Sequence, residues 1–172
     1  KVIEILNRDR GISLHEMPTL LMEFNGFSAT GLKEEMGYVE EICLENRSVF
    51  LDKGIGAAER ARLWEMRHLT LESIKRSHAG LLPLIMDVAV PLSRYSEIVA
   101  FVKEEVKGLV AYIFGHAGDG NVHVVVMGKP DDIERWVLIE KANRNIVLKA
   151  IEFEGTCTGE HGVGIGKRRF LP

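Results

Sequence analysis

The sequence predicts an α+β fold in which an antiparallel sheet carries its helices on one face. Short β-rich runs alternate with longer stretches whose apolar residues have helical spacing, and the order strand–helix–strand–helix occurs twice along the chain. No linker or low-complexity segment separates the two repeats. With 172 residues, the chain is long enough for one full core or for one compact two-part domain.

The first repeat follows an N-terminal segment, residues 1–6, whose pattern is typical of an amphipathic helix. A strand is expected at 19–24, because this apolar run lies between Pro18 and the turn signal Asn25-Gly26. The remaining elements of the repeat are a helix at 32–46, a short strand at 49–51 and a long helix at 57–77.

The second repeat opens with a strand at 84–90 that Pro91 ends. Ser93 is a candidate N-cap for a helix that runs to about Lys107. The repeat continues with strands at 109–114 and 122–127, joined by a glycine-rich loop, and with a helix from Asp131 or Asp132 to about Phe153.

Composition narrows the classes of function. A net charge of −3, with 22 basic and 25 acidic residues, creates no basic field and argues against a nucleic-acid partner. No apolar run reaches the roughly 20 residues that a transmembrane helix needs. Two cysteines are too few for a disulfide framework and suit a reducing compartment, so a cytoplasmic location is expected.

Two glycine-rich stretches, 115–123 and 155–167, contain the residues that are best suited to bind a metal ion or to transfer a proton. His116 and His123 flank a hairpin turn that brings them back together, and Glu160 lies in the second stretch. Two histidines and a carboxylate are a ligand set for a catalytic divalent metal such as Zn, Mn or Fe. His161 lies beside the carboxylate, where a histidine can accept a proton.

The residues alone leave several interpretations of these stretches open. A metal-dependent hydrolase or a non-haem iron oxygenase would use the same two histidines and carboxylate, and glycine-rich loops often only turn corners. A phosphate-binding P-loop is excluded, because His161 replaces its first glycine and Arg168 follows the lysine.

Both stretches closely resemble the signature motifs of the FAD-linked oxidase C-terminal domain family, which includes D-lactate dehydrogenases, the glycolate oxidase D subunit and D-2-hydroxyglutarate dehydrogenases. The Arg-His pair at 67–68 and the run Cys-Thr-Gly-Glu-His at 157–161 are most similar to cytochrome-linked, mitochondrial-type D-lactate dehydrogenases. The motifs that carry the resemblance are Gly-His-Ala-Gly-Asp-Gly-Asn-Val-His at 115–123, Gly-Thr-Cys-Thr-Gly-Glu-His-Gly-Val-Gly-Ile-Gly-Lys at 155–167, Pro-Thr-Leu-Leu-Met-Glu-Phe at 18–24, Trp-Glu-Met-Arg-His at 64–68 and Asp-Val-Ala-Val-Pro-Leu-Ser at 87–93.

The resemblance implies roles for individual residues in a ferredoxin-like cap over a separate FAD-binding domain. His161 matches the residue that takes the substrate hydroxyl proton. Arg67 matches the arginine that holds the substrate carboxylate, and Asn121 matches a residue lining the same pocket. The matches to the family's metal ligands are His116, His123 and Glu160. Within this resemblance the basic cluster Lys167–Arg169 is either a contact for flavin phosphates or a partner, or a plain surface cluster.

The implied function is the oxidation of a D-2-hydroxy acid, of the D-lactate or glycolate type, to the 2-keto acid. The implied partners are the substrate, the protein's own FAD domain and an electron acceptor such as a cytochrome. The location would be cytoplasmic or peripheral to the inner membrane, and mitochondrial in a eukaryote. Relatives that use a dicarboxylic hydroxy acid carry lysine and asparagine where this chain has Ile85 and Val125, which favours a monocarboxylate.

The chain itself, residues 1–172, is expected to be the C-terminal cap domain of a longer flavoenzyme, whose FAD-binding domain is built from a longer N-terminal segment and the extreme C-terminus. On its own it is expected to bind no FAD and to be inactive, because hydride acceptance is cofactor chemistry that no side chain performs. A non-catalytic module that keeps the fold without its partner domain is the remaining alternative.

Overall fold

A computed structural model describes residues 1–171, apart from the side chain of Arg62. The chain divides into two compact units. The first, called here the sheet unit, consists of Lys1–His15 and Thr70–Pro172, and the second, the helical unit, consists of Glu16–Leu69. Each unit is described separately.

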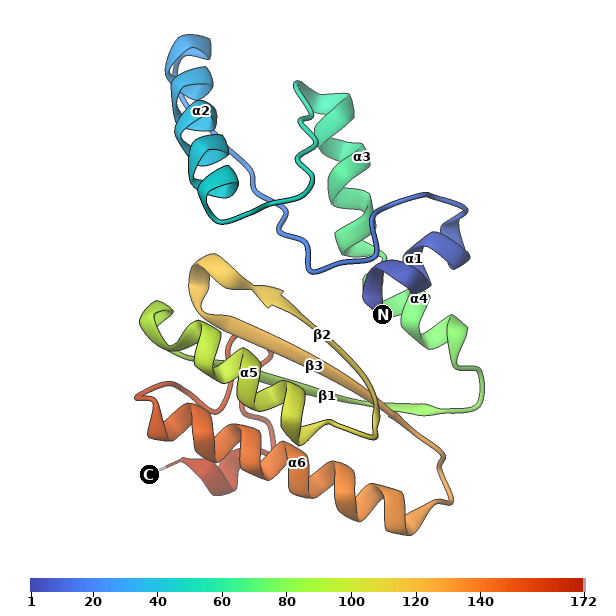
Figure 1. Ribbon diagram of the computed structural model, residues 1–172. Coiled ribbons are helices and arrows are strands. Elements are labelled where there is room, and N and C mark those ends of the chain that lie inside the picture. The colour runs from blue at the N-terminus through green and yellow to red at the C-terminus, as the bar shows by residue number, and fades with distance from the viewer. Residues whose placement is uncertain (172) are drawn as a thin grey trace. The chain divides into compact units, whose positions relative to one another are not determined.

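The sheet unit is built on three antiparallel strands in the order β1-β3-β2. These are β1 (Leu82–Ala89), β2 (Val110–His116) and β3 (Asn121–Gly128), with β3 buried along its whole length. Helices α5 (Tyr95–Glu105) and α6 (Ile133–Glu152) pack on one face and close the main core (Figure 1). The predicted α+β class with an antiparallel sheet is confirmed.

Local sequence signals explain where these elements begin. A three-residue 3-10 turn, η1 (Leu92–Arg94), precedes α5 after Pro91, so Ser93 lies inside that turn and not at the cap of the helix. Asp132 caps α6, because its side chain accepts a hydrogen bond from the backbone N–H of Arg135 at 2.9 Å. The alternation of the β3 side chains then divides the strand between two faces, with Val122, Val124 and Val126 in the main core.

The second face of the sheet has an apolar part and a polar part. Helices α1 (Val2–Arg10) and α4 (Thr70–Ser77) cover the apolar part, where Ile5 and Ile74 pack against Val125. Two residues before Val125 on β3 is His123, which is aligned with Asp87 on β1 and with Phe114 on β2. A carboxylate and an imidazole therefore lie side by side on this face, beyond the part that the two helices cover.

The helical unit contains α2 (Ala29–Glu45) and α3 (Ala57–His68), and it corrects three predictions. Residues 19–24 and 49–51 are not strands. Both segments are β-rich, but a strand exists only where a neighbouring strand pairs with its backbone groups, and no such neighbour is present among the described residues. The long helix predicted at 57–77 is interrupted at Leu69, which is also the boundary between the two units.

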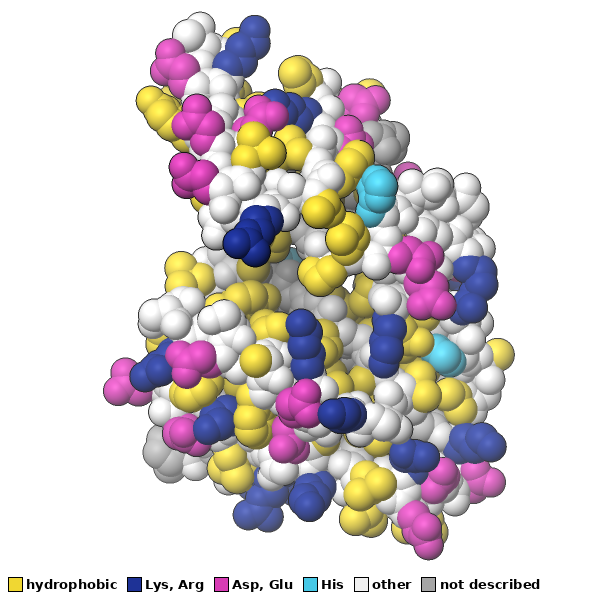
Figure 2. Space-filling view, viewed as in Figure 1, with side chains coloured by type: hydrophobic (Ala, Val, Ile, Leu, Met, Phe, Trp, Pro, Cys, Tyr) yellow, Lys and Arg dark blue, Asp and Glu magenta, His cyan; other side chains and the backbone are white. Residues whose placement is uncertain are grey.

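The surface carries both signs of charge. Figure 2 shows acidic and basic side chains interspersed over one face of the molecule, with hydrophobic side chains between them. Across residues 1–171, no helix is both long enough and apolar enough to cross a membrane.

Candidate metal and proton-transfer site

The β2–β3 hairpin brings two of the predicted metal ligands together. His116 ends β2 and lies opposite Asn121, while His123 lies opposite Phe114, so both histidines point to the same face of the sheet. Their ring centroids are 5.5 Å apart and nearly perpendicular. Gly120 allows the turn, because its φ of +71° is in the left-handed region and a Cβ there would lie 1.9 Å from the carbonyl oxygen of Val90.

The second glycine-rich stretch folds back onto the end of β1. Thr156 forms an isolated antiparallel bridge with Ala89, in which its N–H donates to the Ala89 carbonyl at 2.8 Å. The chain then passes over β1 at Thr158 and Gly159. Gly159 has no room for a side chain, because a Cβ would lie 1.8 Å from Nδ2 of Asn121. This close approach brings Glu160 and His161 next to the two histidines of the hairpin.

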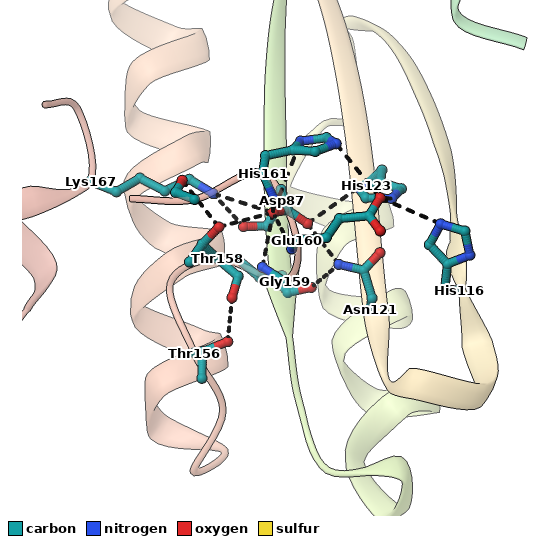
Figure 3. Close-up of polar contacts among 12 residues, drawn as sticks. Asp87, His116, Asn121, His123, Thr156, Thr158, Gly159, Glu160, His161 and Lys167 are labelled. Carbon is teal, nitrogen blue, oxygen red and sulfur yellow. Dashed lines mark hydrogen bonds and ion pairs between the residues drawn. The ribbon is translucent and has the colours of Figure 1, made fainter. Parts of the chain in front are cut away.

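Glu160 is the meeting point of the three histidines (Figure 3). Its Oε1 lies 3.0 Å from Nε2 of His123, 3.4 Å from Nε2 of His116 and 3.7 Å from Nε2 of His161. His123 is buried, whereas about half of the side-chain surface of Glu160 and of His161 is exposed. The ring of His161 stacks on that of His123, with centroids 4.8 Å apart and planes 10° from parallel. The bottom of the site, at His123, is therefore buried, and its rim, at Glu160 and His161, is accessible to solvent.

Asp87 on β1 holds the loop that carries Glu160 and His161. Its Oδ2 accepts hydrogen bonds from the backbone N–H groups of Gly159, Glu160 and His161, each at 2.9 Å, and from Oγ1 of Thr158 at 3.0 Å. Burial alone would raise the pKa of Asp87, but the hydrogen bonds outweigh it and hold the pKa well below its usual value. The carboxylate is therefore charged and fully hydrogen-bonded.

Two overlapping groups of side chains have the spacing to hold a metal ion, with ligand atoms within 4.8 Å of one another: Asp87, His123 and His161, or His116, His123 and Glu160. The first group is the poorer candidate, because four donors already occupy Oδ2 of Asp87. In the second group the carboxylate of Glu160 faces both Nε2 atoms and reaches solvent. Two imidazoles and one carboxylate fit Zn, Mn or Fe.

Comparison with known proteins identifies the family of the chain. The sequence matches the family of FAD linked oxidases, C-terminal domain, over residues 2–172. The chain belongs to this family. Similar proteins include the mitochondrial D-lactate dehydrogenase [cytochrome] of Arabidopsis thaliana, 36% identical over 172 residues that cover 98% of this chain and 30% of the relative. Another is the probable mitochondrial D-lactate dehydrogenase of Danio rerio, 32% identical over 172 residues, or 99% of this chain and 34% of the relative.

A bacterial relative, the glycolate oxidase subunit GlcD of Bacillus subtilis, is 33% identical over 166 residues, or 94% of this chain and 34% of the relative. The chain spans about a third of the length of these curated relatives. All three relatives are named for oxidation of a 2-hydroxy acid. The predicted membership of the FAD-linked oxidase family is confirmed.

Of the six site residues predicted for this FAD-linked oxidase domain, four meet at Glu160, namely His116, His123, His161 and Glu160 itself. Asn121 is buried at the start of β3, where its Nδ2 donates to Oδ1 of Asp87 at 2.7 Å and to the carbonyl of Val88 at 3.2 Å. Its Oδ1 is buried without a hydrogen-bond partner. Arg67 lies on α3 in the helical unit, and its role remains a prediction.

Lys167 is not part of a plain surface cluster at 167–169, which was one of the interpretations of the sequence. Its Nζ turns inward, donates a hydrogen bond to the backbone oxygen of Asp87 and lies 4.0 Å from Oδ2 of the same residue. Burial lowers the pKa of Lys167, while the Asp87 carboxylate opposes that effect. Arg169 points away from this contact and pairs with Glu140 at 3.5 Å. Lys167 therefore belongs to the support of the site.

Asp87 opens the motif at 87–93, but the sequence alone predicted no role for it. The signal was available, because Asp87 is the single charge in the apolar run 84–90. A charge within a buried strand needs hydrogen-bond partners or an opposite charge. The partners of Asp87 are 34–80 positions away in the sequence, and only the folded chain identifies them.

Substitution of Gly159 tests the close packing under the site. We expect Gly159→Ala to lower the free energy of unfolding by about 1–3 kcal/mol, because the new methyl group overlaps the buried amide of Asn121. Gly166→Ala is the matched control, since a Cβ at Gly166 has nothing within 4 Å, and its effect should stay within about 0.5 kcal/mol. Denaturant unfolding of both variants measures the difference. Equal stability of the two variants would contradict the packing described here.

Proposed function

We propose that this chain is the substrate- and metal-binding cap domain of an FAD-dependent dehydrogenase that oxidises a D-2-hydroxy acid to the 2-keto acid. The observation that carries the proposal is the convergence of His116, His123 and Glu160, with His161 stacked beside them and open to solvent. The family supports the flavin, and the names of the relatives support the type of substrate.

The reaction moves a hydride from Cα of the substrate and a proton from its hydroxyl group. A divalent ion held by His116, His123 and Glu160 would lower the pKa of the substrate hydroxyl and orient it. His161 accepts the hydroxyl proton, since its exposed ring lies at the rim of the ligand group without belonging to it. The flavin, carried by a separate domain, supplies the hydride acceptor.

Arg67 is assigned to the substrate carboxylate in this proposal. A guanidinium offers a planar pair of donors that matches a carboxylate. This assignment depends on the family motif at 64–68, in which the arginine stands.

The preferred substrate is a monocarboxylate, such as D-lactate or glycolate. Ile85 and Val125 are cross-strand neighbours, one pair along the same face from Asp87 and His123. Val125 is fully buried, and Ile85 offers only an apolar side chain. Neither residue can form an ion pair or hydrogen bond with a second carboxylate, so a dicarboxylic acid gains nothing at this position.

The names of the relatives also bear on the electron acceptor and the location. The Arabidopsis thaliana relative is named as cytochrome-linked and mitochondrial. By this likeness the electron acceptor would be a cytochrome or a similar electron-transfer protein. In a eukaryotic cell the location would be mitochondrial.

The test uses the full-length protein that carries this chain. Under anaerobic conditions, D-lactate or glycolate should bleach the oxidised flavin absorbance, and L-lactate and D-2-hydroxyglutarate should do so much more slowly. Arg67→Met should raise KM for D-lactate, while Arg169→Met, a surface control whose guanidinium pairs with Glu140 and lies over the Phe170 ring, should not. Absence of flavin reduction with every one of these 2-hydroxy acids would contradict the proposal and leave a metal-dependent hydrolase as the alternative.

A further inference from the structure

Asp87 connects all parts of the site, although it neither faces the open rim nor belongs to the better ligand group. Its two carboxylate oxygens contact different partners. Oδ2 faces the loop at 158–161, and Oδ1 faces the hairpin strand β3. Figure 3 shows Asp87, on β1, at the centre of the polar contacts.

The contacts of Oδ2 determine the path of the loop. Three successive backbone N–H groups, those of Gly159, Glu160 and His161, point at this one oxygen. Successive N–H groups that converge in this way form a concave anion site. Here the bound anion is a side chain of the protein itself. Because the backbones of Glu160 and His161 are both held, the positions of their Cα atoms relative to β1 are set by Asp87.

The contacts of Oδ1 determine the orientation of His123. Oδ1 lies 3.3 Å from Nδ1 of His123, and the opposite ring nitrogen, Nε2, lies 3.0 Å from Oε1 of Glu160. A carboxylate beside Nδ1 favours the tautomer with hydrogen on Nδ1. That tautomer leaves the Nε2 lone pair directed at the place where a metal ion would bind.

Two further groups hold Asp87 itself in place. Asn121 donates its Nδ2 hydrogen to Oδ1, and Lys167 donates to the backbone oxygen of Asp87. The side chain of Asp87 is about 1% exposed, so water cannot replace these partners. An asparagine in its place would keep one oxygen acceptor but lose the charge, and it would turn an N–H₂ group either toward Asn121 or toward the three N–H donors.

We propose that Asp87 is a positioning residue that assembles the ligand group, by clamping the loop that carries Glu160 and His161 and by selecting the tautomer of His123. This inference rests on the proposed metal site for its second part only. The clamp is a property of the folded chain with or without a metal ion.

Hydrogen exchange of the full-length protein tests the clamp. In Asp87→Asn, the amides of Gly159, Glu160 and His161 should exchange about 10–100-fold faster than in the wild type, because a neutral acceptor replaces a charged one. Asp9→Asn is the matched control. Asp9 also accepts side-chain hydrogen bonds in the sheet unit, from Ser73 and Arg76, but it lies outside the site and should leave these amides unchanged.

A milder variant keeps the test decisive if Asp87→Asn does not fold. Thr158→Val removes one donor to Oδ2 and leaves the carboxylate intact. It should accelerate exchange of the same three amides about 2–10-fold, less than Asp87→Asn does, because the charged acceptor remains and loses only one of its donors. Unchanged exchange in Thr158→Val together with unchanged exchange in any folded Asp87→Asn protein would overturn the clamp.

Titration of the metal-depleted protein with Zn²⁺, against a chelating dye, tests the second part. Asp87→Asn should weaken Zn²⁺ binding about 10–100-fold, the usual effect of losing a group that orients a ligand histidine, and Asp9→Asn should not. The tautomer provides an independent readout, because the ¹⁵N shifts of His123 should show loss of the Nδ1 hydrogen in the variant. Equal Zn²⁺ affinity and an unchanged tautomer would overturn the role of Asp87 toward His123. A wild-type protein without Zn²⁺ affinity would instead remove the proposed metal site, and the exchange result would still decide the clamp.

Discussion

His161→Ala is expected to lower kcat of the full-length enzyme about 10²–10⁴-fold, the effect of losing a general base. The ring of His161 is half exposed at the rim of the site, so it can reach a substrate hydroxyl, and it stacks on His123 without being needed as a ligand. The substitution keeps the backbone N–H of residue 161, which is the group that Asp87 holds. The fold of the loop should therefore survive.

Metal analysis distinguishes a lost base from a lost ligand. The metal content of His161→Ala should equal that of the wild type. His78→Gln serves as a control, because His78 hydrogen-bonds Tyr112 in the same unit and lies outside the site, and its kcat should be unchanged. A His161→Ala protein that loses the metal and regains full turnover when metal is added would show that His161 is a ligand and not the base.

Glu160→Gln is expected to have the largest effect on metal binding. The carboxylate oxygen Oε1 is the shared neighbour of both ligand imidazoles, at 3.0 Å from His123 and 3.4 Å from His116. An amide lacks the negative charge that binds a divalent ion. Zn²⁺ affinity should fall by more than about 100-fold, beyond the 10–100-fold expected for groups that only orient a ligand, and kcat should fall with the metal content.

The matched comparison for Glu160→Gln is a surface glutamate of the same unit. Glu152→Gln removes an exposed carboxylate that pairs with Lys149, and it should change neither metal content nor kcat. Hydrogen exchange at 159–161 should stay as in the wild type for Glu160→Gln, because its backbone N–H remains bound to Asp87. If Glu160→Gln keeps its metal, the result would indicate that the ion binds to the other group, that of Asp87, His123 and His161.

The second half of the fold was predictable from local patterns, whereas in the first half the helices were predictable and the two strands were not. Strand β3 and helix α6 lie within a few residues of the predicted elements, because alternation and helical spacing continue through them and Asp132 is a strong cap. The apolar runs at 19–24 and 49–51 have the composition of strands, yet the backbone there has no ladder to join. Composition reports what a segment tolerates, while pairing depends on which segment comes to lie beside it.

The sequence by itself determined the family, the antiparallel α+β class and the residues that meet at Glu160, because the histidines are joined by a short hairpin and the motifs are specific. Only the tertiary structure showed that Asp87 and Lys167 support that site. Their contacts join β1 to a loop and a C-terminal segment 71–80 residues later. Such contacts leave no periodicity in the sequence, since hydrogen bonds between distant segments depend on how the sheet and its loops pack. A lone aspartate in an apolar strand indicates that partners must exist, and the fold alone identifies them.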